Sequence, residues 1–152
     1  MKTLLQRVTR AEVRVDGAVV GRIQGGLLVL LGVERDDQTE DADYMAAKTA
    51  GLRIFPDHSG NMNLSLLETG GSALVISQFT LAADTRKGRR PSFSRAAGPD
   101  PAEQLYRRYV EQLQAAGVTV ETGRFQAMME VELVNDGPVT VLLDPRPDRA
   151  GS

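Results

Sequence analysis

The sequence has no cysteine and only one histidine among its 152 residues. Without cysteine, disulfides, thiolate nucleophiles and sulfur-ligated zinc are excluded, and the composition fits a reducing compartment. A serine hydrolase triad needs an imidazole base, and His58 lies in the turn-like segment Pro-Asp-His-Ser-Gly, where an idle histidine is the ordinary case. One histidine also cannot supply the usual ligands of zinc. We therefore predict no metal site and no histidine-based catalysis.

Long apolar runs and nucleotide-binding glycine patterns are missing as well. The longest apolar run, Leu27 to Leu31 followed by Gly32 and Val33, falls far short of the roughly 20 residues of a membrane helix. Residues 1–7 lack the apolar stretch of a signal peptide. Neither Gly-x-x-x-x-Gly-Lys-Ser/Thr nor Gly-x-Gly-x-x-Gly occurs. These absences predict a cytoplasmic protein that uses no cofactor.

Positive and negative charges nearly balance, and the formal net charge of −2 argues against a general nucleic-acid coat. Residues 86–95 depart from this balance, because they contain five basic residues and no acidic one. Four of the five lie close together, at Arg86, Lys87, Arg89 and Arg90. Clustered Lys and Arg bind phosphates by releasing condensed counterions. A phosphate-binding segment and a merely solvated loop are both compatible with this run.

The chain length favours one domain, and the pattern of apolar residues predicts a mixed α/β fold. Strands are expected over 3–15, 18–23, 27–33, 52–55, 73–82, 118–121, 127–134 and 139–143. Two main helices are expected, one at about 37–51 with an Asp37/Glu40 capping box and one capped by Asp100 and closed by Gly117. We expect a single compact domain over residues 1–144, with strand-rich sheets in β/β/α layers or a barrel-like arrangement. The polar tail at 145–152 is expected to be mobile.

The apolar run at 73–76 turns polar where it continues as Ser77-Gln78-Phe79-Thr80. The pleat of the predicted strand places Ser77 and Phe79 on one face and Gln78 and Thr80 on the other. A strand end leaves backbone N–H groups unpaired, and such groups can stabilise a developing oxyanion. The structural alternative is that the hydroxyls end the strand while Phe79 fills the core.

A glycine-proline pair interrupts two strand-like segments in Asn135-Asp136-Gly137-Pro138-Val139-Thr140. Proline cannot donate a ladder hydrogen bond, so Pro138 marks an edge, a bulge or a turn. The residues alone leave both the cis and the trans form of the Gly137-Pro138 bond open.

Together these segments resemble the D-aminoacyl-tRNA deacylase family. The resemblance rests on the family's two signature motifs, Ser77-Gln78-Phe79-Thr80-Leu81 and Asn135-x-Gly137-Pro138-Val139-Thr140, which are intact and in order. It also includes the Gln6-Arg7-Val8 start and the basic segment at 87–93, and it covers residues 1 to about 143. The resemblance implies a homodimer with its sites at the subunit interface. Its substrate would be the ester that joins a D-amino acid, or mischarged glycine, to the terminal adenosine of tRNA.

The resemblance implies roles for individual residues. The catalytic pocket would be lined by Ser77, Gln78, Phe79 and Thr80. A cis Gly137-Pro138 pair would reach into the partner's pocket, where its carbonyls would clash with an L side chain and admit D and achiral substrates. The pair would be supported by Arg7, Asn135 and Thr140, although an exposed strand arginine is the alternative for Arg7. The acceptor stem would be bound by Arg86, Lys87, Arg89 and Arg90.

We predict that the Phe79 N–H, helped by Gln78 or Ser77, stabilises the ester carbonyl oxygen during hydrolysis. Thr80 as a covalent nucleophile has no visible base to activate it. A role for Thr80 in positioning water or the ribose is preferred, with the substrate's own 2′-hydroxyl assisting catalysis.

Two other classes of protein compete with this interpretation. A non-enzymatic RNA-binding module would use the basic segment, but the three tyrosines and four phenylalanines are scattered and only Phe93 lies in that segment. A small esterase would use Thr80 or Ser77 as its nucleophile, again without a base. Neither alternative accounts for the glycine-proline pair.

Overall fold

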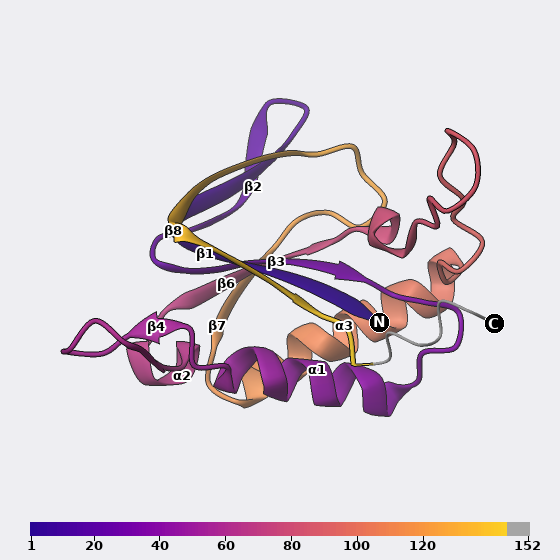
Figure 1. The fold of residues 1–152 in the computed structure, drawn as a ribbon. Helices are drawn as coiled ribbons and strands as arrows, with labels where there is room; N and C mark the ends of the chain where they lie inside the picture. The colour runs from indigo at the N-terminus through magenta and orange to yellow at the C-terminus, as the bar shows by residue number, and fades with distance from the viewer. Residues whose placement is uncertain (146–152) are drawn as a thin grey trace.

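The computed structural model describes residues 1–145, which form one mixed sheet with two long helices along one side (Figure 1). β1 (Lys2–Val15) pairs antiparallel with β2 (Ala18–Ile23) and β3 (Gly26–Gly32) along one edge and with β8 (Glu130–Leu143) along the other. β6 (Ser72–Ser77) and β7 (Thr119–Thr122) continue the sheet beyond β3 as parallel strands. The tail expected to be mobile lies outside the described residues, apart from position 145.

The sheet curls so that β2 packs against β6 and β7, which almost closes it into a barrel. The inward side of the curl holds its own apolar cluster, made by Val8, Ala11, Val13, Ile23, Leu28, Leu74 and Ile76. These side chains alternate along their strands with residues that face the helices, as the period of two in a pleated strand requires. The mixed α/β, barrel-like fold expected from the sequence is confirmed.

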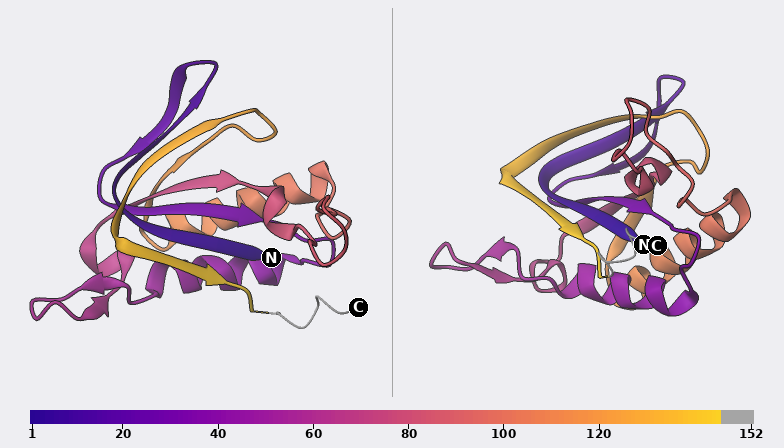
Figure 2. Two further views of the ribbon diagram at one scale, coloured as in Figure 1. Left: turned by 45° about the horizontal axis from the view of Figure 1, so that its top comes forward. Right: turned by 45° about the vertical axis from the view of Figure 1, so that its right-hand side comes forward.

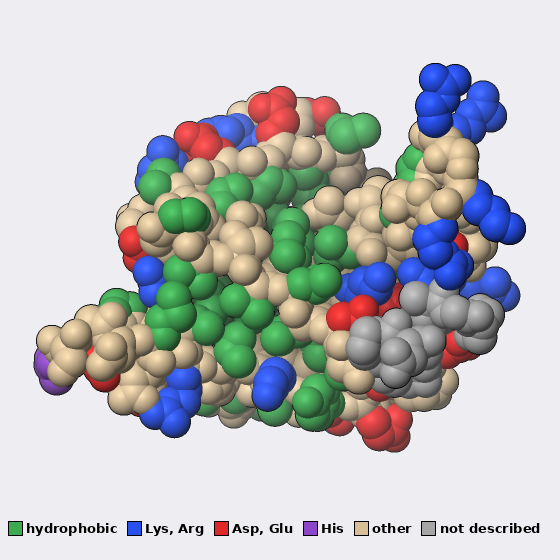
Figure 3. All heavy atoms as spheres, in the orientation of Figure 1, with side chains coloured by type: hydrophobic (Ala, Val, Ile, Leu, Met, Phe, Trp, Pro, Cys, Tyr) green, Lys and Arg blue, Asp and Glu red, His purple; other side chains and the backbone are tan. Residues whose placement is uncertain are grey.

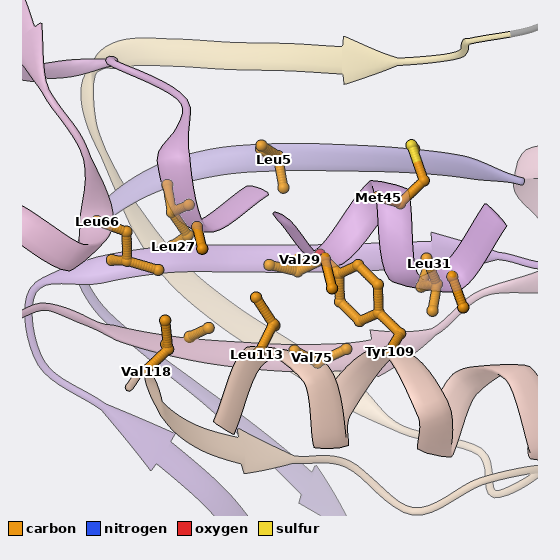
Figure 4. Close-up of a cluster of buried hydrophobic side chains, with 14 of the residues drawn as sticks. Leu5, Leu27, Val29, Leu31, Met45, Leu66, Val75, Tyr109, Leu113 and Val118 are labelled. Carbon is orange, nitrogen blue, oxygen red and sulfur yellow. The ribbon is translucent and has the colours of Figure 1, made fainter. Parts of the chain in front are cut away.

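Two helices, α1 (Thr39–Gly51) and α3 (Pro99–Ala115), cover the other side of the sheet and enclose the larger core (Figure 4). α3 buries Tyr106, Tyr109 and Leu113, a spacing that lines one helical stripe. The Tyr109 hydroxyl donates to Thr49 Oγ1 at 2.7 Å, which fixes α3 against α1. None of the helices among residues 1–145 has the length and apolarity needed to cross a membrane.

The first helix begins later than the sequence suggested. Its N-cap is Gln38, whose N–H donates to the carboxylate of Asp41 at 2.7 Å, so the predicted Asp37/Glu40 capping box is wrong by one position. Asp37 is buried and accepts hydrogen bonds from the Met1 ammonium and from the Glu34 N–H, both at 2.6 Å. Burial raises the pKa of Asp37, while the ammonium opposes that shift. The carboxylate therefore anchors the chain start and cannot also serve as the cap.

The second helix begins earlier than predicted, with Gly98 as N-cap and Pro99 as the first helical residue. Proline suits that position because its missing N–H would be unpaired there anyway. Asp100 lies in the first turn, where its charge is favourable against the helix dipole, and does not cap the helix. Gly117 follows the end of the helix at a φ of +105°, as expected.

The strand predictions need smaller corrections. In place of a strand at 52–55 there is a short hairpin, β4 (Phe55–Pro56) with β5 (Met62–Leu64), followed by the unpredicted one-turn helix α2 (Leu66–Thr69). The two C-terminal strands are one strand, β8, which bends sharply in its middle (Figure 2). The bend falls at the glycine-proline pair, and pairing with β1 resumes on either side of it.

Candidate functional site

β6 ends at Ser77, and the chain then turns into a short 3-10 helix, η1 (Phe79–Ala82). The prediction of a strand as far as residue 82 is therefore wrong, and with it the alternation of side chains beyond Ser77. The Gln78 N–H still donates to Leu31 O at 2.8 Å. Within residues 1–145, the N–H groups of Phe79 and Thr80 donate no hydrogen bond. Such unpaired donors are characteristic of the first residues of a helical turn.

Gly32 at the end of β3 allows η1 to approach the sheet. A Cβ atom at this position would lie 2.9 Å from Leu81 Cβ and 3.1 Å from Gln78 O. A larger residue would therefore push η1 away from the strand. The close contact holds the two free N–H groups at a fixed place beside the end of β3.

Phe79 and Thr80 both line a pocket of about 750 Å³. Its walls come from the end of β6, from η1, from the start of α3 and from the connection between β7 and β8. The predicted catalytic residues Ser77, Gln78, Phe79 and Thr80 all line it. The amide of Gln78 donates to Thr80 Oγ1 at 3.1 Å, and the Phe79 ring is 56% exposed. Phe79 is thus part of the pocket wall and not a core residue.

No described residue that lines this pocket has an ionisable side chain. The single histidine, His58, lies at the exposed tip of the β4–β5 hairpin. This tip is at the far side of the molecule from the basic loop at residues 84–92 (Figure 3). The protein groups available for chemistry in the pocket are therefore hydroxyls, an amide and the main chain.

The sequence did not reveal the opposite wall of the pocket, which is made by Pro99, by residues 125–129 and by Val131. Met128 in this segment is 90% exposed, and Met129 and Val131 beside it are also part of the lining. Two consecutive methionines in a polar stretch were the available signal, because exposed flexible apolar side chains often mark a binding surface.

The basic segment forms a loop over residues 84–92 next to the pocket. Asp84 and Ser92 close it by exchanging backbone hydrogen bonds of 2.7 and 2.8 Å. Arg86 donates to both carboxylate oxygens of Asp84, at 2.9 and 2.7 Å, and this guanidinium holds the pKa of Asp84 well below its usual range. Arg86 thus has its charge compensated within the loop and is the weakest of the predicted phosphate ligands.

Lys87, Arg89 and Arg90 remain exposed, and Figure 3 shows basic side chains projecting from this loop. The base of the loop is tied to the pocket, since the ring of Phe93 meets that of Phe79 edge to face at a centroid distance of 5.2 Å. A phosphate backbone bound by the loop would therefore lie close to a group bound in the pocket.

The glycine-proline pair forms a bulge in β8. Asn135 is paired with Val8 and Thr140 with Gln6, so residues 136–139 loop out opposite the single residue Arg7. The Gly137-Pro138 peptide bond is cis, the form that the resemblance implies. Gly137 has a φ of +140°, and a Cβ there would lie 2.7 Å from Val139 Cγ2, so only glycine fits.

The three predicted supporting residues all contact this bulge. The side chain of Asn135 closes its base, accepting from the Val139 N–H at 2.9 Å and donating to Val139 O at 3.1 Å. Arg7 donates to Asp136 O at 3.0 Å and to Ile54 O at 2.8 Å. Thr140 Oγ1 accepts from the Gln6 amide at 3.3 Å. The bulge is therefore held from both sides, and its glycine and proline have no partner in the pairing with β1.

One chain does not bring the two predicted motifs together. Neither Gly137 nor Pro138 lines the pocket at Ser77–Thr80. Both are exposed on the surface of β8. Within one chain the pair and the pocket are therefore separate features.

Comparisons with known proteins were made against this geometry. A family described as D-Tyr-tRNA(Tyr) deacylase matches residues 4–144, which include both motifs. The chain belongs to this family. Two curated relatives of this chain carry the name D-aminoacyl-tRNA deacylase. The protein from Syntrophotalea carbinolica is 62% identical over 95% of this chain and 97% of its own, and that from Symbiobacterium thermophilum is 60% identical over 95% of each. Their names describe hydrolases of an aminoacyl ester.

A solved structure similar to this deacylase-family chain is described as "c-Myc DNA Unwinding Element Binding Protein". It is 38% identical, with a TM-score of 0.90 over 95% of this chain and 98% of its own. Its fold is the same as the one described above, although its description refers to DNA.

Proposed function

We propose that the protein hydrolyses the ester between a D-amino acid and the terminal adenosine of tRNA, and that it spares the L ester. The observation that carries this proposal is a pocket without ionisable lining, built from the first of the family's motifs and lined by Phe79 and Thr80, whose N–H groups donate no hydrogen bond among residues 1–145. The pocket suits a reaction whose transition state is stabilised by hydrogen bonds and not by a protein acid or base.

In this mechanism the Phe79 N–H, with the neighbouring Thr80 N–H, donates to the carbonyl oxygen of the ester as it becomes an oxyanion. A water molecule forms the new bond to the carbonyl carbon, the bond to the ribose oxygen breaks, and that oxygen takes up a proton. The adjacent ribose 2′-hydroxyl relays this proton, which explains why the pocket needs no histidine. One oxyanion donor is worth about 2.7–4 kcal/mol of transition-state stabilisation.

Thr80 acts as a positioning residue in this proposal. Its hydroxyl accepts from the Gln78 amide at 3.1 Å, which leaves its own proton available to hold a water or the ribose. A covalent role would require a base, and none of the described pocket residues provides one.

Selection against L substrates is proposed to come from a second copy of the chain. The cis Gly137-Pro138 bulge is exposed and absent from its own chain's pocket, so a homodimer is the simplest way to bring it to one. Exposed apolar residues on β8, namely Val131, Val134 and Leu142, provide a surface for that pairing. Hydrophobic side chains also gather in the middle of the face drawn in Figure 3. In the partner's pocket the carbonyls of the bulge would exclude an L side chain, while D residues and glycine would fit.

The deciding experiment compares the deacylation rates of D-tyrosyl-tRNA, L-tyrosyl-tRNA and glycyl-tRNA with the purified protein. Rapid loss of the D and glycyl esters with the L ester intact is expected. Equal loss of the D and L esters would instead identify an unselective esterase with Thr80 or Ser77 as nucleophile, which labelling by a phenylmethylsulfonyl reagent would reveal. If none of the three esters were hydrolysed, the alternative of a nucleic-acid-binding module would remain.

A second experiment tests the part played by the substrate. D-tyrosyl-tRNA ending in 2′-deoxyadenosine should be hydrolysed much more slowly than the natural ester, because the ribose hydroxyl that relays the proton is missing. Undiminished hydrolysis of the deoxy ester would show that the protein or bulk water supplies this step.

A further inference from the structure

A second hollow lies beside the catalytic pocket, between α3 and the end of β7. Its volume is about 470 Å³, and Phe125 lines both this hollow and the pocket. Along α3, Ala102 belongs to the pocket and the next residue, Glu103, to the hollow. The two are therefore neighbouring compartments with one aromatic side chain between them.

Two carboxylates and a guanidinium on α3, namely Glu103, Glu111 and Arg107, line the hollow. Arg107 donates to the carboxylate of Glu103 at 2.6 Å, one helical turn away, so a carboxylate and a guanidinium face the solvent side by side. A second carboxylate, Glu111, lies further along the same lining. With two carboxylates present, the hollow is not a simple phosphate site.

Arg124 differs from the other charged groups of the hollow. It is exposed, and its guanidinium makes no hydrogen bond or ion pair with any residue among 1–145. It directly precedes Phe125, whose half-buried ring packs on Tyr106 at a centroid distance of 6.0 Å. An uncompensated cation thus stands at the boundary between the hollow and the pocket.

We propose that this hollow binds the cytidine that precedes the terminal adenosine of tRNA, with its base at Glu103 and Arg107 and its linking phosphate at Arg124. The inference rests on the proposed function, because it assumes that the terminal adenosine is bound in the pocket. A cytosine edge presents an amino donor beside two acceptors, which matches a carboxylate beside a guanidinium. Proteins read single-stranded RNA by such edge contacts and by aromatic surfaces such as that of Phe125. Every tRNA ends in CCA, so this site would serve all of them.

The test uses three short esters of D-tyrosine: on adenosine, on the dinucleotide CpA and on UpA. For the wild-type protein, kcat/KM should be about tenfold or more higher for the CpA ester than for the adenosine ester, the scale of a hydrogen-bonded charged contact. The UpA ester should lose part of this gain, because uracil presents an acceptor where cytosine presents its amino group. Arg124→Ala should lower the ratio of CpA to adenosine toward one, and Lys48→Ala, which removes an exposed charge on α1, should preserve it.

The outcomes separate this inference from the function on which it rests. Hydrolysis of the adenosine ester at the same rate as the CpA ester by the wild-type protein would overturn the cytidine site and leave the deacylase intact. An unchanged ratio of CpA to adenosine ester hydrolysis in Arg124→Ala would overturn the role of Arg124 and leave the deacylase intact. If no D ester were hydrolysed, the proposed function itself would be overturned.

Discussion

Phe79 contributes two separate things to the proposed chemistry, a ring in the pocket wall and an N–H that could bind the oxyanion. Phe79→Pro removes both, while Phe79→Ala removes only the ring. Proline should fit, because this residue is the first of a helical turn and the preceding Gln78 has an extended backbone with φ −142° and ψ 89°. We expect kcat of the proline variant to be about 10²–10³-fold below that of the alanine variant.

Pre-steady-state deacylation of D-tyrosyl-tRNA would measure this difference, and circular dichroism would confirm that both variants fold. Similar kcat values for the two variants would show that the Phe79 N–H is not an oxyanion donor.

His58 provides the matching prediction for a residue outside the site. It is exposed on a hairpin tip and does not line the pocket. His58→Ala should therefore leave kcat/KM and its whole pH profile unchanged from the wild type. A pH profile that differs between the variant and the wild type would reveal a histidine base that the structure does not predict.

At the scale of elements, the bulge of β8 depends on Arg7 for its position. The Arg7 side chain is only 11% exposed and bonds to two carbonyls, one in the bulge and one before β4. Arg7→Ala would leave Asp136 O and Ile54 O without these partners. We expect a loss of about 2 kcal/mol in the free energy of unfolding, since hydrogen bonds to charged groups contribute on this scale.

The same variant should also hydrolyse L-tyrosyl-tRNA faster relative to the D ester, because the bulge that excludes L side chains is less firmly held. Urea unfolding and the D-to-L rate ratio are the two measurements. Arg10→Ala is the control, because Arg10 lies on the same strand in an exposed ion pair with Glu132. This substitution should change neither the free energy of unfolding nor the D-to-L rate ratio by much. A wild-type D-to-L rate ratio in a destabilised Arg7→Ala variant would show that Arg7 stabilises the fold but is not needed for selection against L substrates.

The basic loop is the second element with a role of its own. Arg89 and Arg90 are exposed, whereas Arg86 is neutralised by Asp84. Replacing both exposed arginines by alanine should weaken the binding of every tRNA alike and lower the slope of log K against log salt by about one for each arginine. Filter binding or fluorescence anisotropy at several salt concentrations would measure the slope. An unchanged slope would remove the loop from the interface.

At the scale of the whole molecule, the proposed homodimer makes a prediction about mixed dimers. A subunit with Phe79→Pro has a defective pocket, and a subunit with Gly137→Ala has a defective bulge, because Val139 leaves no room for a Cβ. If the bulge acts in the partner's pocket, a dimer of one subunit of each kind contains one site in which pocket and bulge are both intact. Each mixed dimer formed by mixing and reannealing should therefore show D-selective deacylation at about half of the level of a wild-type dimer.

Each variant alone provides the control for this experiment, since neither parental dimer has an intact site. Absence of recovery in a mixed dimer, with its composition verified by native mass spectrometry, would mean that pocket and bulge act within one chain. The family membership by itself does not decide between these arrangements.

The linear order of residues determined the features that depend on neighbours in the chain. Alternation and turn residues predicted the strands at 3–15 and 18–23 almost to the residue, because strand faces and hairpin turns are local properties. Composition argued against histidine, thiolate and zinc chemistry, because the sequence has a single histidine and no cysteine. The two motifs were sufficient to indicate the family, which the match over residues 4–144 confirms.

Tertiary contacts decided the remaining features of the fold and the site, because each of these features depends on residues far apart in the sequence. Asp37 does not cap α1 because its partner is Met1, and Phe79 leaves the strand because Gly32 lets η1 pack on the end of β3. The far wall of the pocket at residues 125–129 and 131 and the hollow at Arg124 exist only because β7 lies next to β6 and α3 packs alongside. A local sequence pattern does not determine which distant segment a residue will contact. These long-range contacts place the first motif in a pocket and the second in a separate, exposed bulge.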